Sequence, residues 1–378
     1  MIKRYYQNLE KYLEANKVLV IFGARQVGKT TLLKNFLNST KYKYKFDSGD
    51  SIKVQEALSS QDFSRIFDYC EGYELIVIDE AQRIPNIGMG LKIIVDNIPK
   101  IKVIVTGSSS FELSGQVGEP LTGRKRTLDM YPIAQLELHD KQYKNFSRHE
   151  LRENLSEFLV FGSYPAVLNQ DDKEQKIIAL NEITNSYLFK DIFELEKVKN
   201  SKIIIDLLRL IAFQLGSEVS YHELATQLGI DYKTVARYLD LMEQSFILFN
   251  LRGFSRNLRK EIHKKSKYYF YDLGIRNSII SNFNNLNLRN DIGQLWENFL
   301  IIERLKKQRY TGIFANNYFW RTWEGKEIDF IEEREGKLFA YEFKWQAKQS
   351  KIPKDFVAQY PEHEFKEINQ ENYLDFVL

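Results

Sequence analysis

The chain has 378 residues, a length typical of two or three domains. Hydrophobic residues make up 43% and charged residues 28%, which excludes a wholly disordered chain. The 54 basic and 51 acidic residues leave a net charge of +3, so any nucleic-acid surface must be a local patch. One cysteine, Cys70, excludes an internal disulfide and a cysteine-based zinc site. With no secretory signal core at the start and no apolar run near the ~20 residues that span a bilayer, we expect a soluble cytoplasmic protein without membrane contact.

The first third of the chain has the pattern of an α/β domain. Residues 1–16 mix charges with apolar side chains, which predicts a short amphipathic helix. Short apolar runs then alternate with helical stretches. The runs lie at residues 18–22, 44–46, 75–78, 103–105 and 127–130. Runs of this length separated by helices predict a parallel sheet that is covered by helices on both faces.

The rest of the chain changes from helical to mixed character. Residues 150–200 have a helical pattern, and residues 201–245 contain three helical segments. Ser220 is a suitable N-cap for the second segment, which should end near Gly229, and Asp231 is a suitable N-cap for the third. A further helix is predicted at residues 291–309, and strands at 246–251, 267–271, 317–323, 326–332 and 338–345.

A phosphate-binding loop follows the first predicted strand directly. The sequence G-A-R-Q-V-G-K-T fits G-x4-G-K-[ST], and a helical stretch comes after it. Glycines let backbone N–H groups turn toward phosphate oxygens, and the helix N-terminus adds positive potential. Lys29 should reach the β- and γ-phosphates and Thr30 should hold Mg²⁺, so we expect ATP and Mg²⁺ as cofactors. The predicted nucleotide-binding residues are Gly23, Ala24, Arg25, Gln26, Val27, Gly28, Lys29, Thr30 and Thr31.

The third apolar run, L-I-V-I, ends in two carboxylates. Asp79 would hold the metal, directly or through water, and Glu80 would orient and polarise the attacking water. By themselves these residues could equally be two solvated acids at the end of a strand. Beside a phosphate loop they predict a Walker B motif, and Glu80 favours hydrolysis over binding alone.

Hydroxyl and basic residues accompany the next two strands. The run T-G-S-S-S follows the fourth strand at the carboxyl edge, where open α/β sheets bind ligands. Ser108 is the candidate γ-phosphate sensor, with helix capping as the alternative. Arg124 and Arg126 come just before the fifth strand. Either arginine could reach a phosphate in the same or a neighbouring subunit, and a solvated charge is the alternative.

These motifs resemble those of a group of prokaryotic AAA+ ATPases. The matching pieces are G-A-R-Q-V-G-K-T, L-I-V-I-D-E-A-Q, T-G-S-S-S and L-T-G-R, with further matches at residues 161–165, 190–192, 296–299 and 327–330. The resemblance covers about residues 1–345 and implies a five-stranded core of order 5-1-4-3-2. It also implies that Arg124 matches the family's recurrent arginine. Ser163 departs from the family pattern, in which a second glycine is expected.

Residues 201–275 have the pattern of a winged helix. Its third helix should bury one apolar stripe and present a basic face, which a helix-turn-helix module places in the major groove. The segment 252–267 then carries seven basic residues against one acid, and such a wing suits phosphates. The predicted DNA-binding residues are Lys233, Thr234, Arg237, Arg252, Arg256, Arg259, Lys260, Lys264 and Lys265, and Lys267 is the seventh basic residue of the wing. Winged helices also act as protein-binding modules, which is the alternative.

The C-terminal region brings a third group of charged residues. Glu297 lies on the predicted helix, Asp329 on a strand, and Glu342 and Lys344 on the next strand, where they share one face. A two-residue hairpin turn at 335–336 would place Asp329 opposite Glu342. Two opposed carboxylates repel each other, and a divalent cation would convert them into a ligand set.

This spacing resembles the nucleases with a D…E-x-K core, and the family's C-terminal domain is similar to that fold. The sequence therefore predicts a possible second metal site made by Glu297, Asp329 and Glu342, with Lys344 positioned to stabilise negative charge. The same register puts Glu327 opposite Lys344, so a structural ladder of salt bridges is the alternative.

Together these features predict a P-loop AAA+ core with a five-stranded parallel sheet, a helical and winged-helix region, and a C-terminal α+β restriction-nuclease-like domain. The predicted domains are 1–150 (ATPase), 151–200 (helical connector), 201–275 (winged helix) and 276–378 (nuclease-like). We expect an ATPase that moves or remodels DNA as a homo-oligomer, such as a hexameric ring. The alternatives are a nucleotide switch that signals to a protein partner and a small-molecule kinase.

Overall fold

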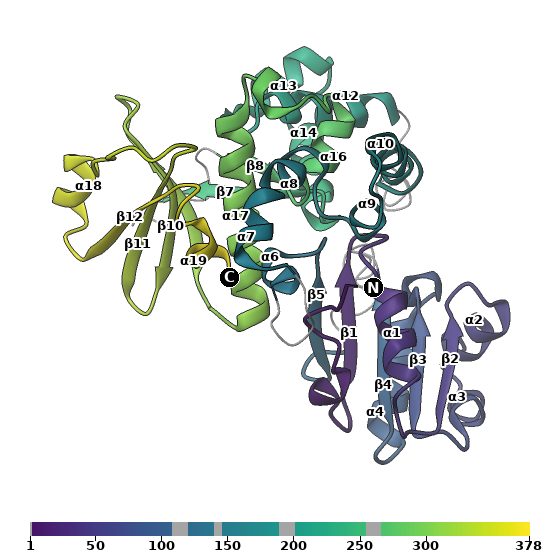
Figure 1. Ribbon diagram of the computed structural model, residues 1–378. Coiled ribbons are helices and arrows are strands. Elements are labelled where there is room, and N and C mark those ends of the chain that lie inside the picture. The colour runs from purple at the N-terminus through teal and green to yellow at the C-terminus, as the bar shows by residue number, and fades with distance from the viewer. Residues whose placement is uncertain (1, 108–119, 140–145, 189–200, 255–265) are drawn as a thin grey trace.

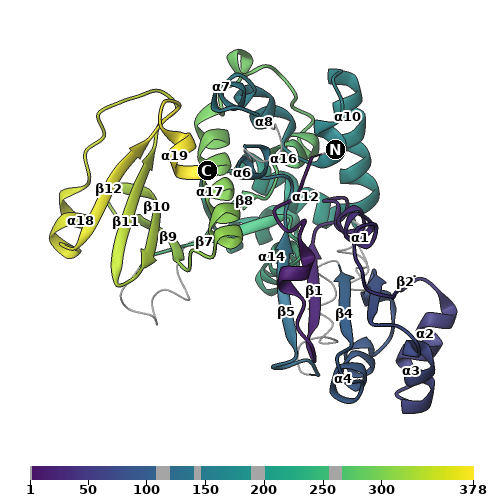
Figure 2. The same cartoon turned by 60° about the horizontal axis from the view of Figure 1, so that its bottom comes forward.

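The computed structural model describes residues 2–107, 120–139, 146–188, 201–254 and 266–378 (Figure 1). The chain builds an N-terminal α/β layer structure, a group of helices, and a C-terminal mixed sheet that is crossed by one long helix. Figure 2 shows the same three parts from a second direction, with the N-terminal sheet at one end and the C-terminal sheet at the other. No helix within these ranges is long and apolar enough to cross a bilayer.

The N-terminal sheet has five strands in the order β2-β3-β4-β1-β5, and every neighbouring pair is parallel. The strands are β1 (Val18–Gly23), β2 (Tyr44–Ser48), β3 (Leu75–Asp79), β4 (Lys102–Gly107) and β5 (Lys125–Met130). This confirms the predicted fold class and the strand order that the family resemblance implied.

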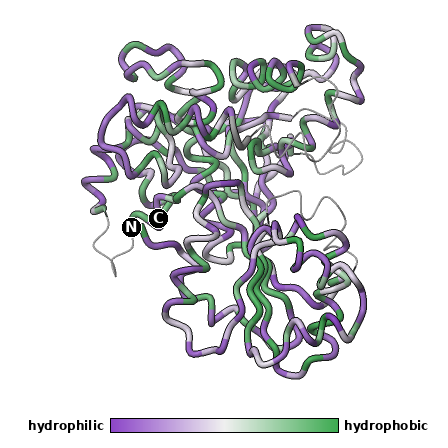
Figure 3. Tube along the Cα trace, turned by 90° about the vertical axis from the view of Figure 1, so that its right-hand side faces the viewer, coloured by the Kyte–Doolittle hydropathy of each residue, from purple (hydrophilic) through white to green (hydrophobic). Residues whose placement is uncertain are grey.

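Helices cover both faces of this sheet. Alternate residues of β1 belong to two separate clusters of buried side chains: Leu19 and Ile21 pack with α1, and Val18 and Val20 pack with α2, α3 and α4. The helices are α1 (Lys29–Leu37), α2 (Ile52–Ser59), α3 (Phe63–Cys70) and α4 (Ile87–Asn97). Because β1 is buried on both faces, its sequence is continuously apolar. Figure 3 shows the central strands as the most hydrophobic part of this layer.

The prediction of an amphipathic helix at the N-terminus is wrong. Among the described residues 2–16, the helical structure is limited to one 3-10 turn, Leu9–Tyr12. The side chains of Arg4 and Tyr6 are instead buried against the rest of the protein. A short helix has little stability of its own, so these tertiary contacts decide the backbone conformation.

The helical region contains the three segments predicted at 201–245. Ser220 caps α13 by accepting from the Glu223 N–H at 3.3 Å, and Asp231 caps α14 by accepting from the Thr234 N–H at 3.0 Å. Gly229 ends α13 in the left-handed conformation. The described helices of the region are α6 (Gln135–Leu138), α7 (Arg148–Glu153), α8 (Leu155–Phe161), α9 (Pro165–Leu168), α10 (Lys173–Glu182), α12 (Ser201–Phe213), α13 (Tyr221–Leu228), α14 (Tyr232–Gln244) and α16 (Leu273–Ile279).

At the loop that contains Ser163, α8 packs closely against α16. A Cβ on Gly274 would lie 2.1 Å from the Phe161 carbonyl oxygen, and a Cβ on Gly162 would lie 2.1 Å from the Asp272 carboxylate. The Ser163 N–H donates to that carboxylate at 2.7 Å, and burial raises the pKa of Asp272 to about 6. The loop therefore has a packing role, in which the backbone of Ser163 takes part.

The second sheet has seven strands in the order β12-β11-β10-β9-β7-β8-β6. β7 and β9 pair in parallel, so the strands of the segment predicted as a winged helix and those of the C-terminal region form one sheet. The turn predicted at 335–336 is confirmed, with Arg334 opposite Lys337. The elements are β6 (Glu218–Val219), β7 (Leu248–Gly253), β8 (Ser266–Phe270), β9 (Asn316–Arg321), β10 (Glu327–Arg334), β11 (Lys337–Phe343), β12 (His363–Ile368), α17 (Ile292–Thr311), α18 (Lys354–Gln359) and α19 (Tyr373–Val377).

Candidate ATP site and a second carboxylate cluster

The phosphate loop connects β1 to α1, and two of its glycines have specific steric roles. Gly28 has φ +99°, a conformation that other residues rarely adopt, and a Cβ on Gly23 would lie 2.2 Å from the Met130 carbonyl oxygen on β5. Lys29 is 4% exposed, and its ammonium donates to the carbonyls of Gly23 at 2.7 Å and Ala24 at 2.9 Å. The loop thus presents a cation and the N-terminus of α1 at the carboxyl edge of the sheet.

The residues that would hold Mg²⁺ are already in contact. The Thr30 hydroxyl donates to one Asp79 carboxylate oxygen at 2.6 Å, and the Thr106 hydroxyl donates to the other. One carboxylate and one hydroxyl, side by side at the phosphate loop, are the donor set that a P-loop uses for the ion. The residues present therefore fit a Mg²⁺ bound together with nucleotide phosphates.

Sequence reasoning missed Thr106. Its side chain is fully buried at the end of β4, and its oxygen also accepts from the Glu80 N–H at 3.0 Å. Thr106 therefore fixes both acids of the Walker B strand. The signal was its place as the first hydroxyl of the T-G-S-S-S run, but the prediction chose Ser108, which lies outside the described residues.

Glu80 leaves the end of β3 in an uncommon backbone conformation. Its φ is +54°, which non-glycine residues adopt seldom and which is often retained at functional sites. The Gln82 side-chain amide donates to its carboxylate, and a Cβ on Gly49 would lie 2.3 Å from its carbonyl oxygen. Glu80 is thus held next to the predicted metal ligand Asp79 by contacts on both its backbone and its side chain.

Arg124 and Arg126 lie at the amino ends of the parallel strands, whereas the phosphate loop lies at their carboxyl ends. β5 runs parallel to β1, with Lys125 opposite Val18 and Met130 opposite Gly23. At ~3.3 Å per residue, the strand separates the start of β5 from the phosphate loop by roughly 17 Å. Arg124 contacts Asp96, and Arg126 contacts Glu14 at 2.9 Å. At this distance Arg124 does not reach the phosphate loop of its own subunit, and the two remaining predictions for it are contact with a neighbouring subunit's phosphate and a solvated charge paired with Asp96.

A cavity of about 490 Å³ opens beside the phosphate loop. The N-terminal segment contributes Ile2, the segment between β5 and α6 contributes Ile133, and α9 contributes Pro165. Gly28 and Thr31 line the side toward the loop. Its volume and its mixture of apolar and polar walls are typical of small-molecule sites.

The C-terminal cluster has a cation that the sequence analysis assigned to the exposed wing. Lys267 is only 2% exposed, and its ammonium contacts the carboxylates of Glu327 and, at 3.3 Å, Glu297. The Tyr269 hydroxyl also donates to Glu297. Although burial acts to lower the pKa of Lys267, the two carboxylates raise it above its ordinary value. The prediction of Lys267 as a wing residue is wrong, because the side chain points into the protein.

The predicted metal ligands lie at the same end of this sheet. Asp329 accepts from the Phe343 N–H at 2.7 Å, and Lys344 contacts Glu342 at 2.7 Å. Burial, together with the charges of Glu297 and Glu342, raises the pKa of Asp329 well above its ordinary value. Across the described ranges, no group of three or more His, Cys, Asp or Glu side chains is arranged to hold a metal ion. The predicted second metal site therefore stays a prediction, with Lys267 and Lys344 as cations already in contact with its carboxylates.

The predicted DNA-reading face is only partly described. Lys233 and Arg237 are exposed on α14, Thr234 is half-buried beside them, and Arg252 is exposed on β7. Val235, Leu239 and Met242 are buried, as the apolar stripe predicted. The other predicted wing residues, Arg256, Arg259, Lys260, Lys264 and Lys265, lie outside the described residues.

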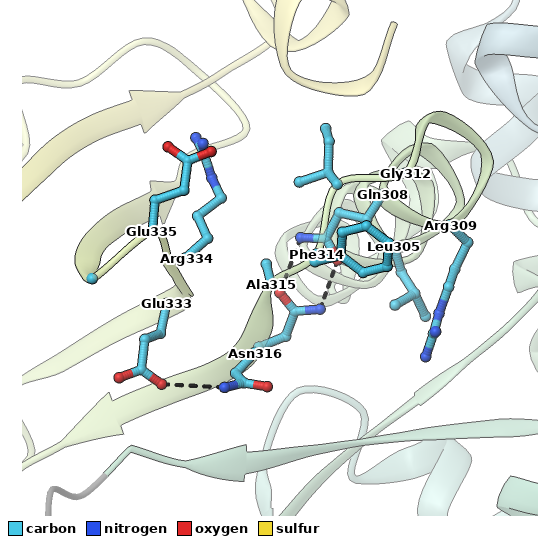
Figure 4. Close-up of a pocket in the computed structure, with 13 residues that line it drawn as sticks. Leu305, Gln308, Arg309, Gly312, Phe314, Ala315, Asn316, Glu333, Arg334 and Glu335 are labelled. Atoms are coloured by element: carbon cyan, nitrogen blue, oxygen red, sulfur yellow. Dashed lines mark hydrogen bonds between the residues drawn. The ribbon is translucent and has the colours of Figure 1, made fainter.

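A further groove of about 790 Å³ lies at the C-terminal end of α17 (Figure 4). The start of β9 forms one wall and the turn between β10 and β11 forms another. Asn316 donates to Glu333 at 3.3 Å, and Phe314 beside it is 92% exposed. No motif of the sequence pointed to this groove, because its walls come from three elements that only the fold brings together.

Three family models match successive parts of the chain. Residues 15–139 match the model described as AAA domain, which agrees with the phosphate loop, the Walker B strand and the five-stranded parallel sheet. Residues 152–286 and 292–372 match two models described as domains of unknown function (DUF8612 and DUF4143). The AAA domain is the part of the chain for which these matches indicate a chemistry, namely nucleotide binding and hydrolysis.

Relatives that match most of the chain are uncharacterized proteins from two bacteria and one archaeon. The chain is 26% identical to one from Mycobacterium tuberculosis over 89% of this chain and 72% of the relative. It is 26% identical to one from Methanocaldococcus jannaschii, over 88% of this chain and 75% of the relative. One from Haemophilus influenzae is 26% identical over 89% of this chain and 85% of the relative. The chain is thus similar to these three proteins over 88–89% of its own length, and its residues 15–139 match an AAA domain.

Proposed function

We propose that the protein is a Mg²⁺-dependent ATPase that uses hydrolysis to move or remodel DNA. The observation that carries the ATPase part is the contact of Thr30 with Asp79 beside Lys29 and Glu80. These residues supply a hydroxyl, a metal-binding carboxylate, a cation and a general base at one edge of the sheet. A chance phosphate loop would not also have the first Walker B acid, Asp79, within hydrogen-bond distance.

Each residue has a distinct task in the proposed reaction. When ATP binds, the Lys29 ammonium gives up its hydrogen bonds to the carbonyls of Gly23 and Ala24 and contacts the β- and γ-phosphates, whose negative charge it offsets. Thr30 and Asp79 would hold Mg²⁺, which neutralises charge on the phosphate oxygens. Glu80 orients the attacking water and accepts its proton.

The cavity beside the phosphate loop suits the nucleoside. One side of the cavity is formed by Gly28 and Thr31, next to the predicted phosphate site. From there the cavity continues to the apolar side chains of Ile2, Ile133 and Pro165. Apolar walls of this kind cover the faces of a purine ring. Arg124 would act on the phosphate of a neighbouring subunit, which requires a homo-oligomer such as a ring.

The DNA part of the proposal is supported by the basic face of α14 and the basic composition of residues 252–265. We infer that the C-terminal cluster serves the architecture of this region as a network of ion pairs, since Lys267 already supplies the positive charge. A nucleotide switch for a protein partner is the second candidate, because the groove at α17 presents the exposed aromatic ring of Phe314. A small-molecule kinase would not need the winged-helix region.

The deciding experiment measures the ATPase rate with duplex, single-stranded and branched DNA, together with the oligomer mass in ATP. The variant K233Q/R237Q should lower both DNA affinity and its salt dependence, by about one log–log unit of slope for each lost phosphate contact. The control K53Q/K100Q removes the same charge from exposed sites of the AAA domain. If no form of DNA binds the protein or changes its ATPase rate, the nucleotide switch remains as the proposed function. The quadruple change of Arg256, Arg259, Lys264 and Lys265 tests the wing in the same assay.

A further inference from the structure

Arg4 joins the phosphate loop to the C-terminal half of the molecule. Its guanidinium donates to the carbonyl oxygen of Val27 in the phosphate loop and, at 2.6 Å, to that of Tyr131 after β5. It also donates to both carboxylate oxygens of Glu137, at 2.9 and 3.2 Å, and to the Tyr310 hydroxyl at 3.3 Å. The residue is 9% exposed, so a charged side chain is held in the interior by partners from four separate segments.

The partners keep this charge in one place. Glu137 is 3% exposed and also accepts from the N–H groups of Tyr5 at 2.7 Å and Ala134 at 2.9 Å. Burial acts to lower the pKa of Arg4, but Glu137 and Tyr310 raise it above its ordinary value. A buried guanidinium with two-point contact to a carboxylate is geometrically well defined. Arg4 is therefore a fixed donor rather than a mobile surface charge.

Holding the Val27 carbonyl has a direct consequence for phosphate binding. The peptide unit between Val27 and Gly28 is planar and trans, so its C=O and its N–H point in opposite directions. Arg4 lies on the carbonyl side and therefore directs the Gly28 N–H away from itself. In a phosphate loop this N–H is one of those that turn toward the phosphate oxygens.

The other end of the network is the last turn of α17. The Tyr310 ring stacks on Tyr5, with centroids 5.0 Å apart and an interplanar angle of 9°, and meets Tyr6 edge-on at 5.2 Å. Six residues earlier on the same helix, Arg304 donates to Glu332 of β10 at 3.0 Å. The helix that anchors Arg4 is thus also fastened to the C-terminal sheet.

We propose that Arg4 is a positioning residue of the ATP site, which aims the Gly28 N–H at the phosphates through the Val27 carbonyl and is itself anchored by Tyr310 of α17. The proposal rests on the proposed ATP binding. It predicts that a hydroxyl on the helix of the C-terminal region contributes to nucleotide affinity without belonging to the phosphate loop.

The test measures affinity for a fluorescent ATP analogue with Mg²⁺, and KM and kcat for ATP. R4M should weaken binding about 10- to 100-fold and raise KM, with kcat changed by less than about threefold, because the water-activating residues are intact. R4K should recover part of the affinity, since it keeps the charge but not the fork of donors. Y310F should weaken binding about two- to fivefold, and R4M/Y310F should bind no more weakly than R4M.

The matched control is R276M. Arg276 is also a buried arginine, bonded to the Ala212 carbonyl and the Asp291 carboxylate, and none of these groups is in the phosphate loop. R276M should lower the unfolding temperature and leave nucleotide affinity at the parent value. A general loss of stability would instead lower affinity in both arginine variants.

The variant K29A separates the two proposals. A parent protein that binds no nucleotide, or binds it equally with K29A, would overturn the proposed ATPase itself. If the parent binds, K29A abolishes binding and folded R4M has parent affinity, the Arg4 proposal is overturned. If R4M does not fold, Y310F decides, because it retains the Arg4 side chain and removes one of its anchors: parent affinity in Y310F overturns the proposal, and reduced affinity with unchanged kcat supports it.

Discussion

Two places in this molecule bring a lysine together with acidic side chains, and they differ in what the charges contact. At the phosphate loop, Lys29 donates to backbone carbonyls and Asp79 accepts from the hydroxyls of Thr30 and Thr106. In the C-terminal cluster, the ammonium of Lys267 contacts the carboxylates of Glu297 and Glu327 directly.

The difference predicts that the phosphate loop takes a ligand and that the cluster does not. Each contact of the phosphate loop joins one charged group to one neutral group and contributes about 1.5–3 kcal/mol, so phosphate oxygens and a metal ion of opposite charge can replace it. A buried lysine among carboxylates is already compensated, and removing it leaves charge without a partner. The number of acids in a cluster is therefore a poor guide to a metal site unless the cations nearby are known.

The sharpest test of this comparison concerns Glu80. In E80Q the side chain keeps its shape but can no longer accept a proton, so ATP should still bind while turnover falls by about 10²- to 10⁴-fold. Single-turnover hydrolysis and equilibrium binding measured on the same protein give the two quantities. Hydrolysis at the parent rate would mean that Asp79 and Glu80 do not form a Walker B motif.

Substitutions in the C-terminal carboxylate cluster should change the stability of the protein rather than its ATPase activity. K267M leaves the carboxylates of Glu297 and Glu327 without their shared cation, and breaking such a buried pair typically costs about 3–5 kcal/mol. Denaturant unfolding measures the loss. The control K344M removes a lysine from a more exposed pair with Glu342 and should cost less than about 1 kcal/mol. Equal effects of the two changes would remove the distinction between a buried and a surface contact.

Metal ions should distinguish the two places most simply. At 100 times its Kd, Mg²⁺–ATP should stabilise the parent protein by about 2.7 kcal/mol, because it binds the folded state. In nucleotide-free protein carrying T30A and D79A, Mg²⁺ or Mn²⁺ should leave the unfolding temperature unchanged. Stabilisation by Mn²⁺ that disappears with D329A would establish the second metal site after all, and cleavage of DNA that disappears with E342A would make it a nuclease.

The sequence predicted those features that depend on neighbours along the chain. The phosphate loop, the five parallel strands and the caps Ser220 and Asp231 follow from local patterns, and the structure has them at the predicted places. Even the register of the β10–β11 hairpin followed from the turn at 335–336.

Features that depend on contacts across the fold could not be predicted in this way. Lys267 lies in a sequence segment rich in basic residues, which predicted an exposed wing. It is buried because β8 packs against α17, which begins 25 residues later. Arg4 lies in a segment with a helical pattern, and its partner Tyr310 is 306 positions away. The joining of β7 to β9 likewise links two segments that the sequence assigned to separate domains.

The smallest expected effect concerns the pH dependence of the cluster. Burial and the charges of Glu297 and Glu342 raise the pKa of folded Asp329 well above its ordinary value. As pH rises above the ordinary aspartate range, the unfolded chain loses this proton before the folded chain does, so the folded state becomes less stable. D329N carries no charge at any pH and can still accept from the Phe343 N–H.

D329N should therefore stabilise the protein at pH 8 by up to ~1 kcal/mol, the scale of a like-charge pair across two strands, and by less at pH 4. Urea unfolding at both pH values measures the difference. The control D355N removes an exposed carboxylate that contacts Lys326 and should not change the pH slope. If D329N is instead less stable than the parent at pH 8, the ionised carboxylate contributes to the network of Lys267 and Lys344, and the repulsion between the opposed acids is the weaker of the two effects.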